Sequence, residues 1–291
     1  MAGTSPAMTA EKLPRLRKLW LCADDYGISP AVNRAIRDLI GRGRINATSV
    51  MVTTPSFSTA EAQALSDLAG PDRRAAIGLH MTLTAPFRPT ALAYRPVARD
   101  GAFLSLAGTF AAGLARRLDP DALAAEAGSQ FAAFQAAFGR PPDFVDGHQH
   151  VHLLPQVSDA MLAAMKRMAP GAWVRQCGRV MPLRRRFGDP KGLVLDLLSS
   201  RLRTRCAASG VPTNPAFAGT YDFKRARAFD ALFASFLHGL PDGGLVMCHP
   251  GFVDAELERL DTFTTMREQE HAFFAGEQFP ALLAAQGIEL A

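Results

Sequence analysis

The sequence predicts an α/β fold, a distorted TIM-like (β/α) barrel with about seven parallel strands and an active site at the C-terminal strand ends. Short apolar segments alternate with longer amphipathic segments along almost all of the 291 residues, which is typical of a parallel sheet with crossover helices. About seven such units are better closed into a barrel than left as an open sheet. The polar residues of chemical interest follow the apolar segments, where a barrel gathers its active site.

The first half of the chain alternates clearly between strands and helices. Residues 19–24 form an apolar run that ends in polar residues, as a buried parallel strand does. Ser29 and Pro30 are expected to begin a helix as its N-cap and first residue, and Gly41 to end it. The units that follow are a strand, a helix, a strand and a proline-rich loop, at residues 49–52, 60–68, 77–83 and 85–100.

The second half repeats the pattern. Asp119 and Pro120 begin a helix whose apolar side chains recur at helical spacing up to Phe138. A short strand over 144–146 precedes a histidine-rich segment, and Pro155 begins the next helix. The remaining elements are a strand, a helix, a strand, a helix and a closing segment, at residues 173–175, 223–237, 244–249, 268–275 and 288–290.

The composition is ordinary for a globular protein, with 48% hydrophobic and 20% charged residues. No apolar run approaches the roughly 20 residues of a membrane span, and residues 1–18 lack the apolar stretch of a secretory signal. We therefore expect a flexible tail over 1–18 and a single barrel domain over 19–291. Four cysteines stand far apart without a C-x-x-C pair, which suits a reducing, cytoplasmic location.

Basic residues are concentrated in one part of the chain. Between Arg175 and Arg205, nine lysines and arginines stand against two acids, whereas the whole chain has a net charge of +5. We expect a basic insertion at about 176–220. It is either a solvated segment without a specific partner or a surface that faces phosphates, anionic lipid or nucleic acid.

Three of the seven histidines stand at alternate positions in residues 144–155, F-V-D-G-H-Q-H-V-H-L-L-P. In an extended segment alternate side chains share one face, so His148, His150 and His152 are expected to line one wall, with Asp146 on the same side. A single histidine is usually an ordinary core or surface residue, but three in five residues beside an acid favour a metal or catalytic site. Its other ligands must come from elsewhere in the chain.

Further candidates lie at or just past the ends of other predicted strands: Asp24 and Asp25, His80, Arg175 and His249. One of the two adjacent carboxylates, with His80 and His148, would hold a cation and leave positions open for water and substrate. The other carboxylate could take a proton from water, and His249 could protonate a leaving group. Two histidines and one carboxylate accept zinc, magnesium, manganese or cobalt.

The chain contains no G-x-S-x-G, P-loop or G-x-G-x-x-G motif, so serine hydrolysis and nucleotide-dependent chemistry lack support. Metal-assisted hydrolysis fits the residues best. Two alternatives stay open. One is another metal-dependent amidase or phosphoesterase on a barrel, and the other is a non-catalytic protein that binds an anionic ligand through residues 175–205.

Four motifs resemble, in this order, the YdjC-like family, also called the ChbG/HpnK carbohydrate deacetylases: A-D-D-Y-G at 23–27, G-L-H at 78–80, D-G-H-Q-H-V-H at 146–152 and M-C-H-P at 247–250. The resemblance runs from about residue 19 to 291. It implies a distorted (β/α) barrel and metal-dependent removal of acetyl from N-acetylated sugars, with chitooligosaccharides and an acetylglucosaminyl hopanoid as known substrate types.

Carried over residue by residue, the resemblance implies that Asp25, His80 and His148 hold one divalent ion, magnesium or zinc in the first instance. It also implies that Asp24 is the general base and that His249 is the acid.

The resemblance implies a supporting or substrate-binding role for Tyr26, His150, His152 and Arg175. The family more often has Phe at the position of Tyr26, whose hydroxyl is therefore expected near the site. The implied substrate is an N-acetylglucosamine-containing oligosaccharide or glycolipid, and a lipid-linked sugar would reconcile it with the basic segment. No nucleic-acid partner is expected, and a homodimer is the base-rate expectation.

Overall fold

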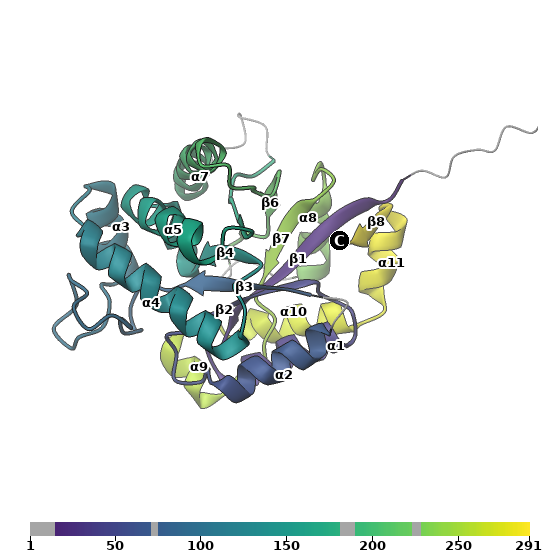
Figure 1. Cartoon of the computed structure of the whole chain (residues 1–291). Helices are drawn as coiled ribbons and strands as arrows, with labels where there is room; N and C mark the ends of the chain where they lie inside the picture. Colours follow the sequence, from purple (N-terminus) through teal and green to yellow (C-terminus); the bar gives the residue numbers. More distant parts are fainter. Residues whose placement is uncertain (1–14, 71–74, 181–189, 223–227) are drawn as a thin grey trace, which may run out of the picture.

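The structure, a computed structural model of the chain, describes residues 15–70, 75–180, 190–222 and 228–291. Within these residues seven parallel strands form a curved sheet in the order β5-β4-β3-β2-β1-β7-β6, and an eighth strand, β8, pairs with β1 (Figure 1). The strands are β1 (Arg17–Tyr26), β2 (Ala47–Val50), β3 (Ala76–Met81), β4 (Phe144–Gly147), β5 (Trp173–Val174), β6 (Phe217–Ala218), β7 (Gly244–Cys248) and β8 (Ile288–Leu290).

The ends of this sheet approach each other. Two isolated parallel bridges, Val174 with Thr213 and Arg179 with Phe217, connect the β5 side to the β6 side. From β1 to β5 the strands follow chain order, so the helices between them join neighbouring strands and cover the outside. The last connection, from β7 to β8, passes over β1, with which β8 pairs. The prediction of a distorted barrel with about seven parallel strands is confirmed.

Helices surround the sheet in Figure 1, and within the described ranges none is long and apolar enough to cross a membrane. They are α1 (Pro30–Gly41), α2 (Thr59–Ala69), α3 (Leu106–Leu114), α4 (Pro120–Phe138), the 3-10 helix η1 (His148–Leu153), α5 (Pro155–Met168), α7 (Pro190–Ala208), α8 (Phe229–Leu237), α9 (Ala255–Leu260), α10 (Thr265–Ala275) and α11 (Gln278–Ala285).

Two helix starts occur where the sequence predicts them. The Ser29 hydroxyl accepts a hydrogen bond from the N–H of Val32, and Pro30 is the first residue of α1. The Asp119 carboxylate accepts hydrogen bonds from two N–H groups in the first turn of α4. Each cap satisfies backbone donors that have no partner inside the helix, which explains why these sequence signals are reliable.

Other elements have no counterpart in the sequence-based expectation. Helix α3 contains no charged residue and α9 is only six residues long, so neither shows a helical pattern of polar and apolar positions. Helix α7 and strand β6 lie in the range 176–220, where only a basic insertion is expected. The helix expected over 223–237 is described from Phe229 onward, and residues 223–227 lie outside the described part.

The predicted tail over 1–18 falls mainly outside the described residues, which begin at 15. Its last two residues, Arg17 and Lys18, already belong to β1 and pair with Ile288 and Glu289 of β8. The two ends of the described chain therefore meet at the N-terminal side of the sheet.

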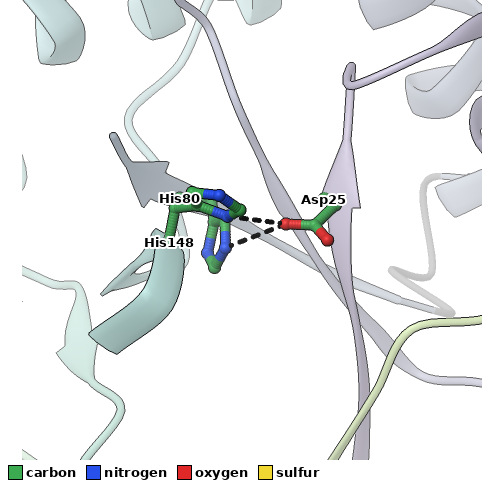
Figure 2. Close-up of side chains that lie close together, drawn as sticks. All are labelled: Asp25, His80 and His148. Carbon is green, nitrogen blue, oxygen red and sulfur yellow. Dashed lines mark hydrogen bonds and ion pairs between the residues drawn. The ribbon is translucent and has the colours of Figure 1, made fainter. Parts of the chain in front are cut away.

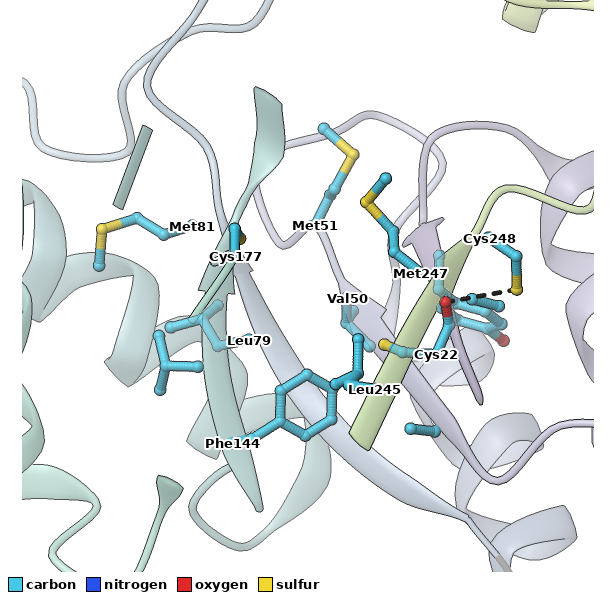
Figure 3. Close-up of a cluster of buried hydrophobic side chains, with 14 of the residues drawn as sticks. Cys22, Val50, Met51, Leu79, Met81, Phe144, Cys177, Leu245, Met247 and Cys248 are labelled. Carbon is cyan, nitrogen blue, oxygen red and sulfur yellow. Dashed lines mark hydrogen bonds between the residues drawn. The ribbon is translucent and has the colours of Figure 1, made fainter. Parts of the chain in front are cut away.

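The core is made of buried side chains on both faces of the curved sheet and on the helices that cover it (Figure 3). Phe144 of β4 and Leu245 of β7 are fully buried, as is Leu79 of β3, which alternation places on the opposite face from its neighbour Gly78. Gly78 leaves room for the Phe144 ring, because a Cβ at position 78 would overlap that ring. This packing holds β3 against β4, the two strands that end in His80 and Asp146.

Candidate metal centre

The site begins where β1 ends. The register between β1 and β2 shifts between Ala23 and Tyr26, and Asp25 has a φ of 69°. That left-handed conformation is unusual for a residue other than glycine and marks a local irregularity in the strand. It lets two adjacent carboxylates reach different partners: Asp25 faces two histidines, whereas Asp24 faces Arg175.

Asp25, His80 and His148 form a buried cluster whose ligand atoms all lie within 4.8 Å of one another. The Oδ1 atom of Asp25 is 3.0 Å from Nδ1 of His148 and 3.4 Å from Nε2 of His80 (Figure 2). One carboxylate oxygen and two imidazole nitrogens converging from three elements are a donor set that a divalent cation accepts. These residues, which the sequence analysis named as candidate ligands, therefore fit a metal ion.

His80 is held from behind by Asp146. The Nδ1 atom of His80 lies 2.6 Å from Oδ1 of Asp146 and 3.0 Å from Oγ of Ser49, which leaves Nε2 directed at Asp25. Burial lowers the pKa of His80, but the negative charges of Asp146 and Asp24 outweigh it and raise the pKa to about 10. The same negative field attracts a cation, and a carboxylate behind a histidine is a common arrangement at metal sites.

The second oxygen of Asp25 is bound by Arg267, whose Nη2 atom lies 2.6 Å from Oδ2. Arg267 is fully buried in α10 and also contacts Asp261 at 2.8 Å. Although burial raises the pKa of Asp25, Arg267 and His148 hold it well below the usual range. Asp25 is therefore ionised, with Oδ1 turned to the histidines and Oδ2 neutralised.

Asp24 makes a bidentate ion pair with Arg175, at 2.6 Å to Nη1 and 2.8 Å to Nη2. Burial raises the pKa of Asp24, but Arg175 and His80 keep it well below the ordinary value. Asp24 also lies near Cys22 and Asp146, a second group close enough to share an ion. The guanidinium of Arg175 already contacts both carboxylates of that group, so Asp25, His80 and His148 are the better metal candidates.

His249 follows β7 and faces Asp24, with Nε2 4.0 Å from Oδ2. Its backbone N–H donates to the Glu270 carboxylate at 2.5 Å, and its ring packs edge-on against Phe263 at 5.4 Å between centroids. Burial lowers the pKa of His249, even though Asp25 and Asp24 act in the opposite direction. Glu270 is also buried, and for a carboxyl group burial raises the pKa, here to about 7.

A cavity of about 690 Å³ opens over these groups. The predicted residues that line it are Asp24, Asp25, His80, His148, His150 and His249. Helices α3 and α7 contribute apolar walls, and Tyr221 and Phe263 complete the opposite side. A polar centre within a largely apolar pocket is the usual form of a small-molecule site.

The predicted common face of the three histidines is wrong. Strand β4 ends at Gly147 and the next residues form η1, in which Gln149 and His150 have left-handed φ values of 53° and 61°. His148 reaches Asp25, and His150 lies 3.5 Å from Sγ of Cys177. The Nε2–H of His152 donates to the backbone carbonyl of Arg175 at 2.9 Å. In the described part of the chain no strand pairs with the residues that follow Gly147, so the backbone turns and alternation no longer applies.

The supporting residues are placed differently from one another. His150 lines the cavity, whereas His152 is fully buried against the Arg175 backbone, and burial lowers its pKa to about 3. Arg175 is fully buried behind Asp24. The Tyr26 hydroxyl bonds Glu61 and Arg37 on the outer helices. Tyr26 does not line the cavity, so its hydroxyl is not at the expected place near the site.

Four site residues receive no role from the sequence: Ser49, Asp146 as the partner of His80, Arg267 and Glu270. Asp146 stands in a recognisable motif, and its position at a strand end is a usable signal. Arg267 and Glu270 lie on a helix far along the chain, where nothing in the local sequence distinguishes them from surface charges.

Comparison with known proteins adds a family and a fold. The family model described as YdjC-like protein matches residues 18–285. The chitooligosaccharide deacetylase of Yersinia pestis (strain Pestoides F) is 26% identical over 248 residues, covering 81% of this chain and 82% of the relative.

Two solved structures are similar in fold. One, from Enterococcus faecalis V583, is described as a proposed cellobiose-phosphate cleavage protein; it has a TM-score of 0.71 at 22% identity and covers 95% of this chain and 97% of its own. The other is a peptidoglycan N-acetylglucosamine deacetylase with a TM-score of 0.50 at 10% identity, covering 94% and 85%. At these identities the two structures support the barrel alone.

Proposed function

This chain belongs to the YdjC-like protein family, and from that premise we infer that it is a carbohydrate N-deacetylase that depends on a divalent metal ion. It would hydrolyse the acetamide of an N-acetylated sugar to acetate and a free amine. The observation that carries the proposal is the convergence of Asp25, His80 and His148 beside an ionised Asp24 and His249 in one cavity.

We assign the metal to Asp25, His80 and His148. A divalent cation there, magnesium or zinc in the first instance, would supply Lewis acidity and lower the pKa of a bound water. Asp146 orients His80 through Nδ1, and Arg267 fixes the free oxygen of Asp25. Both contacts keep the ligand atoms directed at one point before any substrate arrives, which limits the reorganisation that binding requires.

We assign the general base to Asp24. Arg175 binds both of its oxygens and keeps the carboxylate ionised and oriented. An ionised carboxylate beside the acetamide can take a proton from the attacking water. Arg175 thus acts through Asp24, as a positioning residue.

We assign the general acid to His249. Its Nε2 lies on the Asp24 side of the cavity, and the contact of its backbone with Glu270 holds the residue in place. The breaking C–N bond leaves its electron pair on nitrogen, which takes the proton from the imidazolium. Burial lowers the pKa of His249, so the free side chain is mainly neutral and its imidazolium, once formed, is a stronger acid than that of an ordinary histidine. In this proposal His249 is protonated before the C–N bond breaks, and the proton that Asp24 takes from water restores it afterwards.

The name of the Yersinia relative supports an N-acetylglucosamine-containing oligosaccharide as substrate. The apolar walls from α3 and α7 also suit a glycolipid substrate, whose lipid-linked sugar would enter the same cavity. All four cysteines are buried and free of disulfides, in keeping with a reducing compartment such as the cytoplasm.

The proposal is tested by acetate release from a panel of N-acetylglucosamine-containing oligosaccharides and glycolipids. The protein is stripped of metal, assayed, and assayed again after addition of zinc or magnesium. We expect acetate and free amine in equal amounts, only after metal is restored. A metal-loaded protein that releases neither product from any substrate, but cleaves phosphate esters, would contradict the assignment.

A further inference from the structure

Helix α3 presents an unusual surface beside the cavity. Its nine residues, L-A-G-T-F-A-A-G-L, include no charged side chain, yet Leu106 and Leu114 are exposed. Leu106, Ala107 and Phe110 line the cavity itself. The outer face of a surface helix in water usually carries polar or charged residues, so exposed leucines on a helix without any charge are unusual.

The first half of helix α7 has the same character. Leu193, Val194 and Leu197 are all exposed, and the acid among them, Asp196, is buried in an ion pair with Arg179 at 3.0 Å. Val194 and Leu195 line the cavity. The exposed side chains from residue 193 to residue 197 are thus all apolar.

These two helices flank α5, which contacts both of them, and they lie around the same cavity. Five of the eight large hydrophobic residues that are exposed in the described part of the chain belong to them. We call these five the apolar rim: Leu106, Leu114, Leu193, Val194 and Leu197. Leu106 and Val194 line the cavity, and the other three lie on the same two helices. Exposed apolar residues scattered singly need no explanation, but five on two helices that wall one cavity mark an interaction surface.

Exposed arginines lie next to both halves of the apolar rim, and beside α3 they are followed by the exposed acids Asp119 and Asp121. Arg116 and Arg117 follow α3 directly, and both are exposed. Arg201 and Arg203 are exposed on the second half of α7. Apolar side chains beside exposed arginines are the pattern of segments that lie in a membrane interface, with the apolar residues among the acyl chains and the arginines at anionic headgroups.

We propose that the apolar rim docks on a bilayer that contains anionic lipids and turns the cavity mouth toward the membrane. A second copy of the chain is a poorer occupant. A two-fold dimer would place this surface against itself and bring the arginines of both copies together.

The proposal is tested by co-sedimentation of the whole protein with two kinds of vesicle, pure phosphatidylcholine and phosphatidylcholine with phosphatidylglycerol. We expect binding to the anionic vesicles at least tenfold tighter than to the neutral ones, weakening as salt rises. The double variant Leu114→Gln/Leu197→Gln should lose at least tenfold in binding. These two side chains are 52% and 54% exposed and do not line the cavity, so folding and activity on a short soluble substrate should be preserved.

Two controls match these changes. Leu16→Gln alters a leucine that is 44% exposed just before β1, at the other end of the barrel, and should bind like wild type. Arg116→Gln/Arg203→Gln should remove the preference for anionic vesicles, whereas Lys166→Gln/Arg167→Gln, in the last turn of α5, should keep it.

The proposal would be overturned if wild type bound neither kind of vesicle, or if the rim variant and the Leu16 control lost vesicle binding equally. It would also be overturned if the protein bound no vesicle but formed a dimer in sedimentation equilibrium that the rim variant abolished. Vesicle binding does not require catalysis, so its result stands apart from that of the acetate assay.

Discussion

Asp24 and Asp25 show how neighbouring residues of one type receive different tasks from their surroundings. Arg175 binds both oxygens of Asp24, whereas Arg267 binds one oxygen of Asp25 and leaves the other to two histidines. Paired carboxylates take separate roles when their environments differ. Here the difference comes from two buried arginines on opposite sides of one strand end.

At this scale we predict that Asp24→Asn lowers kcat by about 10²–10⁴, the usual contribution of a general base. The variant should still bind one equivalent of metal, since Asp24 is not in the proposed ligand set. Turnover and metal content measured on the same preparation check both statements. Circular dichroism is the necessary control, because Arg175 loses its bidentate partner. A folded variant within tenfold of wild type would remove Asp24 from this role.

At the scale of elements, the strand ends and the segments just after them carry the chemistry. Asp25 is the last residue but one of β1, His80 has the same position in β3, and His148 begins η1 after β4. The parallel register of these strands brings their C-terminal ends together. Packing between β3 and β4 therefore also sets the distance between His80 and Asp146.

We predict that Gly78→Ala destabilises the protein by about 1–3 kcal/mol, the usual cost of overpacking a core. The added Cβ would overlap the Phe144 ring unless β3 and β4 move apart. Urea unfolding of the two proteins measures the difference. Gly128→Ala in α4 is the matched control, since a Cβ there meets nothing within 4 Å. It should stabilise the helix by up to about 1 kcal/mol. An unchanged unfolding free energy for Gly78→Ala would mean that the ring moves aside freely.

At the scale of the whole molecule, the metal centre exists only in the folded chain. Asp25 and His148 are 123 residues apart in sequence and meet at 3.0 Å. The unfolded chain cannot hold these ligands together, so metal binding favours the native state.

We accordingly predict that zinc or magnesium raises the melting temperature of the metal-free protein. A free metal concentration of 100 times Kd would add about 2.7 kcal/mol, which corresponds to a shift of several degrees for a chain of this size. Differential scanning fluorimetry with increasing metal measures it. His80→Ala should abolish the shift, while His150→Ala, outside the proposed ligand set, should retain it. A full shift in His80→Ala would exclude His80 as a ligand.

Much of the fold could be predicted because its signals are local. The caps at Ser29 and Asp119 and the apolar strands each depend on neighbours within a few residues. Helix α3 was not predicted because it lacks charged residues. Helix α7 and strand β6 were not predicted because basic residues dominate their part of the sequence. The expectation of an extended histidine segment was wrong because alternation of side chains requires a strand paired with its neighbours, and this pairing stops where β4 ends.

The sequence by itself determined the family, the strand and helix alternation, and the aspartates and histidines that could hold a metal, because residue type and spacing carry these properties. Only the tertiary structure decided which arginine serves which aspartate, that Asp146 stands behind His80, and that Tyr26 turns away from the cavity. It alone also joined α3 and α7 into one apolar rim. These relations depend on contacts between residues far apart in the chain, which no local pattern records.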